Sequence, residues 1–186
     1  MSDNFSPLLH QNLDRLRSAA LAGPVLDLAC GGGRNGLHLI ASGIPVVFAD
    51  VNPDALGRVS SALSSEPFQQ HQSLATLQEI DLETPNNPPL EPVSYGAIMV
   101  FRYLHRPLLE NMKAAVKPGG LVIYETFTLD QRQFGRPRNP DFLLQTNELK
   151  DIFENWDIHF SYEGILTGQQ GQPQSAIAQI VASKPN

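Results

Sequence analysis

The stretch from Val25 to Gly36, VLDLACGGGRNG, constrains the fold more than any other part of the chain. An apolar run typical of a buried strand leads directly into a loop with four glycines in six residues. Gly31, Gly33 and Gly36 match the pattern G-x-G-x-x-G, which places a phosphate-bearing ligand at the turn between a strand and a helix. Because chance matches to this pattern are frequent, the surrounding residues must decide which ligand the loop serves.

Strands and helices alternate along the rest of the chain. Strands are predicted at 24–30, 45–51, 95–101, 121–127, 157–164 and 175–185, with a further short strand within 74–82, and helices at 8–22, 34–43, 53–65, 107–116 and 147–156. This alternation predicts an α/β fold with a mainly parallel sheet and right-handed crossovers. The sequence GQQGQPQ at 168–174 suits a hairpin turn, so one antiparallel strand is expected near an edge. We predict a single domain over 1–186, without internal repeats.

Composition narrows the classes of protein. The net charge of −6 disfavours broad binding to nucleic acid, whose phosphates an acidic surface repels. The chain has one cysteine, Cys30, and this excludes an internal disulfide framework and a cysteine-rich metal site. Cys30 itself is predicted to be a small residue packed in a tight loop. No apolar run approaches the ~20 residues of a spanning helix, and the first residues lack the layout of a signal peptide. We therefore predict a cytoplasmic protein with no metal and no membrane partner.

Acidic residues around the glycine loop favour a ligand that carries a cation. Asp27, four residues before Gly31, would repel a pyrophosphate but would attract an ammonium group. Asp50 ends the second strand, where a carboxylate accepts from both ribose hydroxyls in dinucleotide and S-adenosylmethionine sites alike. Asp81 follows the third strand and is a candidate acceptor for an adenine amino group.

These residues carry a resemblance to the class I S-adenosylmethionine-dependent methyltransferases. VLDLACGGGRN, the FAD strand end and VKPGG support it, and VFRYLHRPL, YETFT and GRPRNPDFLL are similar to bacterial tellurite-resistance-like methyltransferases. The resemblance implies a Rossmann-like seven-stranded sheet of order 3-2-1-4-5-7-6, with strand 7 antiparallel and helices on both faces. One departure is Ser94-Tyr95, where the family has an aspartate at the start of the fourth strand.

The same resemblance implies S-adenosylmethionine as the cofactor. Asp27 and Gly31 to Gly33 would hold the methionine part, Asp50 the ribose and Asp81 the adenine edge. With their neighbours, the predicted cofactor residues are Asp27, Ala29, Gly31, Gly33, Arg34, Asp50, Val51, Asp81, Leu82 and Phe101.

Ionisable residues follow the fourth and fifth strands, where the methyl acceptor is expected. The predicted catalytic residues are Arg102, Tyr103, His105 and Glu125. His105 is the candidate general base, because a histidine titrates near neutral pH; the alternative is a helix cap. Glu125 would attract a sulfonium, and Arg102 would either hold an anionic acceptor or form a structural ion pair with Glu125.

Two segments are expected to cover the site. Residues 1–23 are predicted to form an N-terminal helical segment that caps it, and residues 128–144 a lid loop in which Arg132, Arg136 and Arg138 select a negative group. The sequence NPPL, from Asn87 to Leu90, resembles an amino-methyltransferase signature but precedes the fourth strand instead of following it. This position argues against methylation of nucleobases.

The leading functional hypothesis is an S-adenosylmethionine-dependent methyltransferase with a small-molecule acceptor, which the arginines suggest is anionic. The alternatives are a nicotinamide-dependent oxidoreductase and a non-catalytic S-adenosylmethionine-binding module. Methylation of RNA or protein would need an extension that 186 residues leave little room for. The acceptor atom and the oligomeric state stay open.

Overall fold

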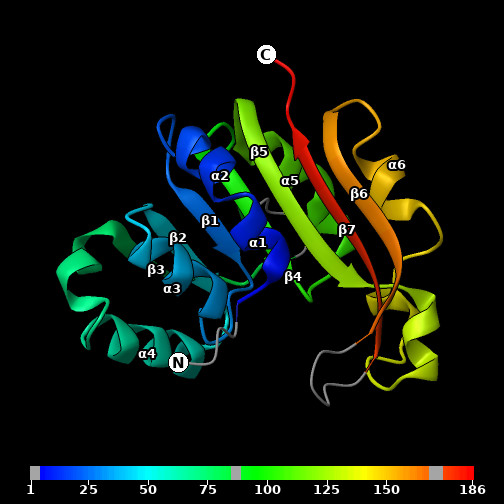
Figure 1. Ribbon diagram of the computed structural model, residues 1–186, viewed down its shortest axis with the longest axis horizontal. Helices are drawn as coiled ribbons and strands as arrows, with labels where there is room; N and C mark the ends of the chain where they lie inside the picture. Colours follow the sequence, from blue (N-terminus) through cyan, green and yellow to red (C-terminus); the bar gives the residue numbers. More distant parts are fainter. Residues whose placement is uncertain (1–4, 85–88, 168–173) are drawn as a thin grey trace.

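A seven-stranded sheet of order β3-β2-β1-β4-β5-β7-β6 forms the centre of the computed structural model, which describes residues 5–84, 89–167 and 174–186 (Figure 1). Strand β7 runs antiparallel to β5 and β6, and the other neighbours are parallel. The strands are β1 Val25–Leu28, β2 Val46–Asp50, β3 Ala75–Glu79, β4 Tyr95–Phe101, β5 Val116–Phe127, β6 Asp157–Leu166 and β7 Ser175–Ser183. The expected strand order and the direction of strand 7 are confirmed.

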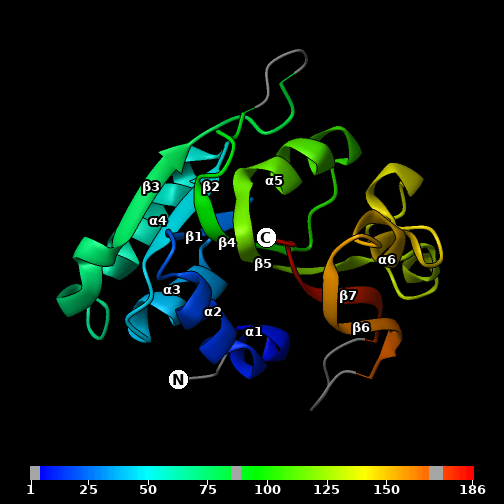
Figure 2. The same cartoon turned by 90° about the horizontal axis from the view of Figure 1, so that it is seen from above.

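Helices cover both faces of the sheet. Helices α1 (Pro7–Gln11), α2 (Leu13–Ala19), α3 (Arg34–Ala41) and α4 (Pro53–Leu63) pack on one face, and α5 (Leu109–Ala115) and α6 (Glu148–Ile152) on the other. Figure 2 shows α1, α2 and α3 on one side of the strands and α5 on the opposite side. Each face has its own hydrophobic core, so the central strands β1 and β4 are buried on both sides.

Local sequence explains where several elements begin. Helix α4 starts at Pro53, which needs no backbone N–H there, and the Asn52 side chain accepts from the N–H groups of Asp54 and Ala55. The helix predicted over 8–22 divides into α1 and α2 at Asn12, whose side-chain amide donates to the Leu8 carbonyl. The break turns the chain before it reaches β1.

The connection over 128–144 is more regular than a long polar loop would suggest. It contains two short 3-10 turns, η3 (Leu129–Gln133) and η4 (Pro140–Phe142), and a bridge joins Thr128 to Leu144. Strand β5 also starts at Val116, five residues before the predicted start. The hairpin expected at 168–174 and the Asn87 motif fall largely on residues 168–173 and 85–88, outside the described residues.

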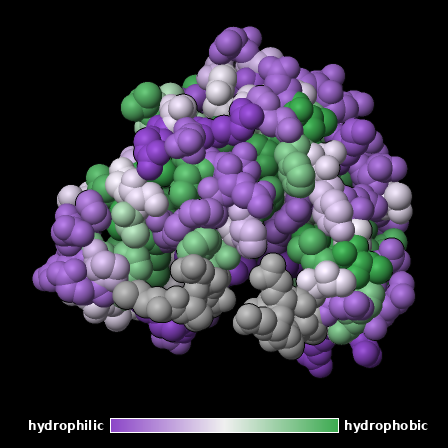
Figure 3. All heavy atoms as spheres, viewed as in Figure 1, coloured by the Kyte–Doolittle hydropathy of each residue, from purple (hydrophilic) through white to green (hydrophobic). Residues whose placement is uncertain are grey.

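At the edge of the sheet, β6 leaves large side chains exposed: Phe160, Tyr162, Ile165 and Leu166. Figure 3 shows hydrophobic side chains gathered on the side of this face where β6 and β7 lie. Within the described residues, no helix has both the length and the apolar character needed to cross a bilayer.

Candidate active site

The glycine loop between β1 and α3 is built from left-handed backbone positions. Ala29, Gly31 and Gly33 have φ angles of 54°, 54° and 71°. A side chain at Gly33 would lie 2.6 Å from the Val59 methyl group, so the loop packs tightly against α4. A Cβ atom at Gly31 would have no neighbour within 4 Å among the described residues, and the loop is therefore open to a ligand on that side.

Asp50 fastens the glycine loop to the end of β2. Its Oδ2 accepts from the Gly31 N–H at 2.7 Å, and its Oδ1 accepts from the Asn52 N–H at 2.9 Å. Each carboxylate oxygen has two lone pairs, so one acceptor position on each oxygen remains for a ligand hydroxyl. The residue is half-buried.

Asp27 lies under the glycine loop with only 3% of its surface exposed. Burial raises the pKa of its carboxyl to about 8, against the opposing effects of the Gly36 N–H bond and the Arg34 charge. The Gly36 N–H donates to Asp27 Oδ2 at 3.0 Å. A ligand cation beside Asp27 would favour the charged form, so this site is poised to exchange a proton for an ammonium group.

The other predicted cofactor residues lie along the same edge. Asp81 is exposed after β3 and accepts from the Glu83 N–H through Oδ1 at 2.9 Å. Val51 is exposed, Leu82 is buried in the α5–α6 core, and Phe101 at the end of β4 packs against the α1–α4 core. Parallel pairing of β1 with β2 and β4, and of β2 with β3, brings these strand ends together.

Beyond β4 and β5, Arg102 and Glu125 form an ion pair. Arg102 adopts a left-handed φ of 62°, its N–H donates to the Glu125 carbonyl at 2.8 Å, and its Nη2 lies 3.1 Å from Glu125 Oε1. The guanidinium carbon lies 4.4 Å from the centroid of the Phe127 ring, within the range of a cation–π contact. Of the two alternatives for Arg102, the ion pair with Glu125 is therefore present in the structure.

Glu125 is almost fully enclosed, with 4% of its surface exposed. Its Oε2 accepts from Gln179 Nε2 at 2.6 Å and from Ser6 Oγ at 3.4 Å. The Ser6 N–H in turn donates to Asn35 Oδ1 at 2.9 Å. This network links the N-terminal segment, the first turn of α3, the end of β5 and the middle of β7.

Sequence reasoning did not find Ser6, Asn35 or Gln179. A buried carboxylate must have hydrogen-bond partners, so the position of Glu125 at the end of a buried strand was the available signal. The partners come from positions 119 residues before and 54 residues after it. The β5–β7 register reveals Gln179, and the packing of the N-terminal segment against α3 reveals Ser6 and Asn35.

The remaining ionisable residues after β4 have separate environments. Tyr103 donates to Glu83 Oε1 at 3.3 Å, and burial together with the Glu83 charge raises the pKa of its hydroxyl. His105 directly precedes the 3-10 turn η2 (Arg106–Leu108) as its first flanking residue. Arg106 binds both carboxylate oxygens of Glu148 at 2.6 and 2.9 Å. Its role is therefore structural, because this pair holds the start of α6 against the residues after β4.

A cleft of about 770 Å³ opens beside Arg102. Its charged lining consists of Arg102, Arg136, Arg138 and Glu83, and its apolar and aromatic lining of Tyr103, Leu104, Phe127, Pro137 and Phe142. In the part of the chain that the structure describes, neither His105 nor the glycine loop lines this cleft. A second cavity, of about 430 Å³, lies at the opposite end of β5 against α2, away from the predicted site residues.

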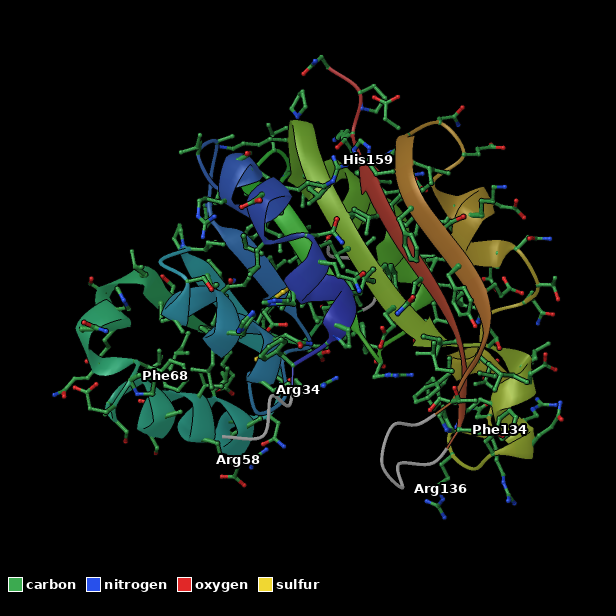
Figure 4. The ribbon with its side chains drawn as sticks, in the orientation of Figure 1. Arg34, Arg58, Phe68, Phe134, Arg136 and His159 are labelled. Carbon is green, nitrogen blue, oxygen red and sulfur yellow. The ribbon has the colours of Figure 1, made fainter. Side chains whose placement is uncertain are left out.

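Hydrogen bonds within residues 128–144 hold Arg136 and Arg138 at the rim of the cleft beside Arg102. Buried Gln131 donates to the Arg136 carbonyl at 3.2 Å and accepts from the Ala176 N–H at 2.9 Å. Arg132 Nε donates to the Arg138 carbonyl at 3.1 Å, so Arg132 braces the segment. Figure 4 shows Arg34 and Arg136 at the same edge of the molecule, from α3 and from this segment.

Comparisons with known proteins agree on one group. A family model described as tellurite resistance protein TehB matches residues 9–169. A probable S-adenosyl-L-methionine-dependent methyltransferase TehB from Haemophilus influenzae is 26% identical over 142 residues, covering 72% of this chain and 46% of that protein. The chain thus spans about half the length of the curated relatives it matches.

Solved structures show the same fold. The crystal structure of TehB from Haemophilus influenzae has a TM-score of 0.68 at 22% identity, covering 94% of this chain and 62% of that one. A SAM-dependent methyltransferase from Methanosarcina mazei has a TM-score of 0.68 at 16% identity, covering 97% and 98% of the two chains. At these identities the structural likeness establishes the architecture.

Proposed function

Because this chain belongs to the TehB family, we propose that it is an S-adenosylmethionine-dependent methyltransferase acting on a small-molecule acceptor with an anionic group. The observation that carries the proposal is the charge pattern along one edge of the sheet. Carboxylates surround the glycine loop after β1 and β2, and arginines line the cleft after β4 and β5. A cationic cofactor and an anionic acceptor would lie side by side on such an edge.

The residues around the glycine loop suit S-adenosylmethionine. Asp27 would pair with the ammonium of the methionine part, and the remaining lone pairs of Asp50 would accept from the ribose hydroxyls. Asp81, exposed after β3, would accept from the adenine amino group. A nicotinamide dinucleotide suits the site less well, because its pyrophosphate offers no cation to pair with Asp27 beneath the loop.

When bound, S-adenosylmethionine would supply a methyl group whose carbon accepts a lone pair of the acceptor while the carbon–sulfur bonding pair stays on sulfur. The task of the chain is to align the acceptor and to exclude water. Arg102, fixed by Glu125 and Phe127, would bind the anionic group of the acceptor. If the acceptor atom carries a hydrogen, His105 remains the candidate base, and it would have to enter the cleft to act.

The covering segments retain their predicted roles in this proposal. Residues 1–23 would cap the site, with Ser6 as the link to Asn35 and Glu125. Stacking of Phe5 on His38, with ring centroids 3.6 Å apart, holds the same segment to α3. Residues 128–144 would act as the lid, since Arg136 and Arg138 lie at the rim of the cleft, while Arg132, predicted to bind the anion as well, braces the segment instead.

Binding and turnover experiments test the proposal. We expect the purified protein to bind S-adenosylmethionine and S-adenosylhomocysteine with micromolar affinity in calorimetry, and to release S-adenosylhomocysteine with a member of an acceptor library. Binding of NADH without binding of either sulfur nucleoside would overturn the proposal. Tight cofactor binding with no turnover across a broad library would favour the non-catalytic binding module. A cytoplasmic location without nucleic-acid or membrane partners accompanies the proposal as a prediction.

A further inference from the structure

The cleft beside Arg102 has more apolar wall than a small inorganic anion can use. Phe127 and Phe142 face it from the end of β5 and from η4, and Leu104 and Pro137 complete the apolar lining. Phe142 is 51% exposed, so this wall of the cleft is in contact with water until a ligand covers it. Large exposed aromatic side chains in a cleft are typical of sites that bind an apolar body.

The cleft has one partly buried arginine, Arg102, and two exposed arginines at its rim, Arg136 and Arg138. Arg102 stands against Phe127 with 30% of its side chain exposed, and its Nη2 contacts Glu125. Its remaining donors can bind a planar anion, which a guanidinium holds with two parallel hydrogen bonds. Arg136 and Arg138 are exposed at the rim, whereas Glu83, the one acidic residue in the described lining, accepts a bond from Tyr103.

The cleft adjoins the predicted cofactor residues through Glu83, whose N–H donates to Asp81 Oδ1. Cavities of about 300–1,000 Å³ accommodate organic ligands of drug size, and this one measures about 770 Å³. Within the described residues, the glycine loop and Asp50 do not line it, so its space serves a second ligand. An oxyanion of four or five atoms would fill a small part of that space and would leave the aromatic side chains of the cleft exposed to solvent.

We infer that the acceptor is an organic anion with an aromatic ring, whose carboxylate or similar planar acid binds Arg102 while the ring packs between Phe127 and Phe142. This inference rests on the proposed function, because it names the acceptor class of the same site. Arg136 and Arg138 then attract the acid to the mouth of the cleft.

Four probes separate ring from charge in calorimetric titrations of protein saturated with S-adenosylhomocysteine: 2-naphthoate, its neutral counterpart 2-naphthamide, butyrate and tellurite. We expect 2-naphthoate to bind at least tenfold more tightly than each of the other three. The Phe142→Ala variant should weaken 2-naphthoate binding about fivefold, since it removes one wall. The Arg102→Gln variant should weaken it about tenfold and abolish the preference over 2-naphthamide.

Two controls keep the test sharp. Phe160→Ala removes another exposed phenylalanine, 41% exposed on β6 and outside the cleft lining, and should leave 2-naphthoate binding unchanged. Affinity for S-adenosylhomocysteine should be equal in all variants, which verifies that the fold is intact. If Arg102→Gln fails this check, Arg138→Gln at the exposed rim replaces it, with a loss of about threefold.

The outcomes distinguish this inference from the proposed function. If S-adenosylhomocysteine binds but tellurite or butyrate binds as well as 2-naphthoate, the inference is wrong and the proposed function stands. Binding of 2-naphthoate that Phe142→Ala and the arginine variant leave unchanged would also overturn it. Failure to bind S-adenosylhomocysteine or S-adenosylmethionine at all would overturn the proposed function, and this inference with it.

Discussion

The two halves of the candidate site are built in opposite ways. After β1 and β2, the contacts come from backbone N–H groups and carboxylates, and Asp27, Gly31, Gly36 and Asp50 all lie within 24 positions of one another. After β4 and β5, the cleft uses arginines and aromatic rings from segments between Glu83 and Phe142. The first half is acidic and local in sequence, and the second is basic and assembled from distant segments.

This difference indicates which half of the site tolerates amino-acid substitutions. A loop that depends on left-handed backbone angles and on bonds to two carboxylates has few alternatives, because any side chain at Gly33 meets α4. A cleft lined by exposed side chains can change its ligand when one side chain is replaced. We therefore expect substitutions in the two halves to have separable effects, one on the cofactor and one on the acceptor.

The largest separable effect is expected at Asp50. Asp50→Ala should weaken S-adenosylmethionine binding by about 1.5–3 kcal/mol, because it removes acceptors for the ribose and the bond that holds Gly31. Calorimetry on the folded variant measures this. Asp54→Ala, an exposed carboxylate four residues away at the start of α4, is the matched control and should bind normally. Normal binding by Asp50→Ala would show that the ribose lies elsewhere.

A side chain at Gly36 should disturb the local half through packing. A Cβ there would overlap the Phe48 ring and lie 2.8 Å from Asp27 Oδ2, so Gly36→Ala should lower the free energy of unfolding by about 2 kcal/mol. Gly57→Ala in α4, where nothing lies within 4 Å, should raise it by about 0.5–1 kcal/mol. Urea denaturation compares the two. Equal effects would mean that the loop relaxes around the added methyl group.

Asp27 predicts a pH dependence confined to the cofactor half. Below its pKa of about 8 the carboxyl holds a proton that an arriving ammonium displaces, so cofactor affinity should fall about tenfold, or about 1.4 kcal/mol, per pH unit below 8. Titrations from pH 6 to 9 measure this slope. Asp27→Asn should remove it and bind weakly throughout. A pH-independent affinity in the unaltered protein would place the ammonium away from Asp27.

The same proton affects the stability of the free protein with a defined sign. The unfolded carboxyl has its ordinary pKa of 3.8, so between about pH 4 and 8 the folded state holds one proton more than the unfolded state. The free energy of unfolding should therefore fall as pH rises through this range, by at most about 1.4 kcal/mol per unit. In Asp27→Asn this contribution disappears.

The smallest effect is expected at the rim of the acceptor half. Arg136→Ala combined with Arg138→Ala should raise the KM for the acceptor about three- to tenfold, since both residues are exposed and their charges are screened by salt. Cofactor affinity should stay normal because the rim lies after β5. Steady-state kinetics at low and high salt would test both points. An equal loss of cofactor affinity would mean that the segment closes over the methionine carboxylate.

Much of the fold followed from local patterns. Fully apolar strands such as β4, with helical periods between them, predicted a parallel sheet, and family resemblance supplied the order that places β7 between β5 and β6. The break at Asn12 escaped prediction because the apolar spacing of residues 8–22 continues across it. The 3-10 turns after β5 escaped because their stability comes from remote groups, such as the bond between Gln131 and Ala176.

The site residues with local contacts were likewise predictable from the sequence, whereas those with remote contacts were predicted only in part. The bonds of Asp27 and Asp50 to the glycine loop are local, so spacing alone pointed to these residues. Arg102 and Glu125 were paired correctly, but as one of two alternatives, and the cation–π contact with Phe127 was not expected. Phe142 was missed because its role depends on how the segment after β5 folds back, which no periodicity encodes.

The position of β7 has a consequence for how the chain assembles during its synthesis. Strand β6 leaves the ribosome before β7, yet in the described sheet it pairs with β7 and not with β5. Strands β1 to β5 are thus able to associate in order of emergence, whereas β6 must wait for Ser175–Ser183. Until then Glu125 lacks its bond from Gln179. The hydrogen-bond support of Glu125, and with it the ion pair that fixes Arg102, is therefore complete only after β7 has been made.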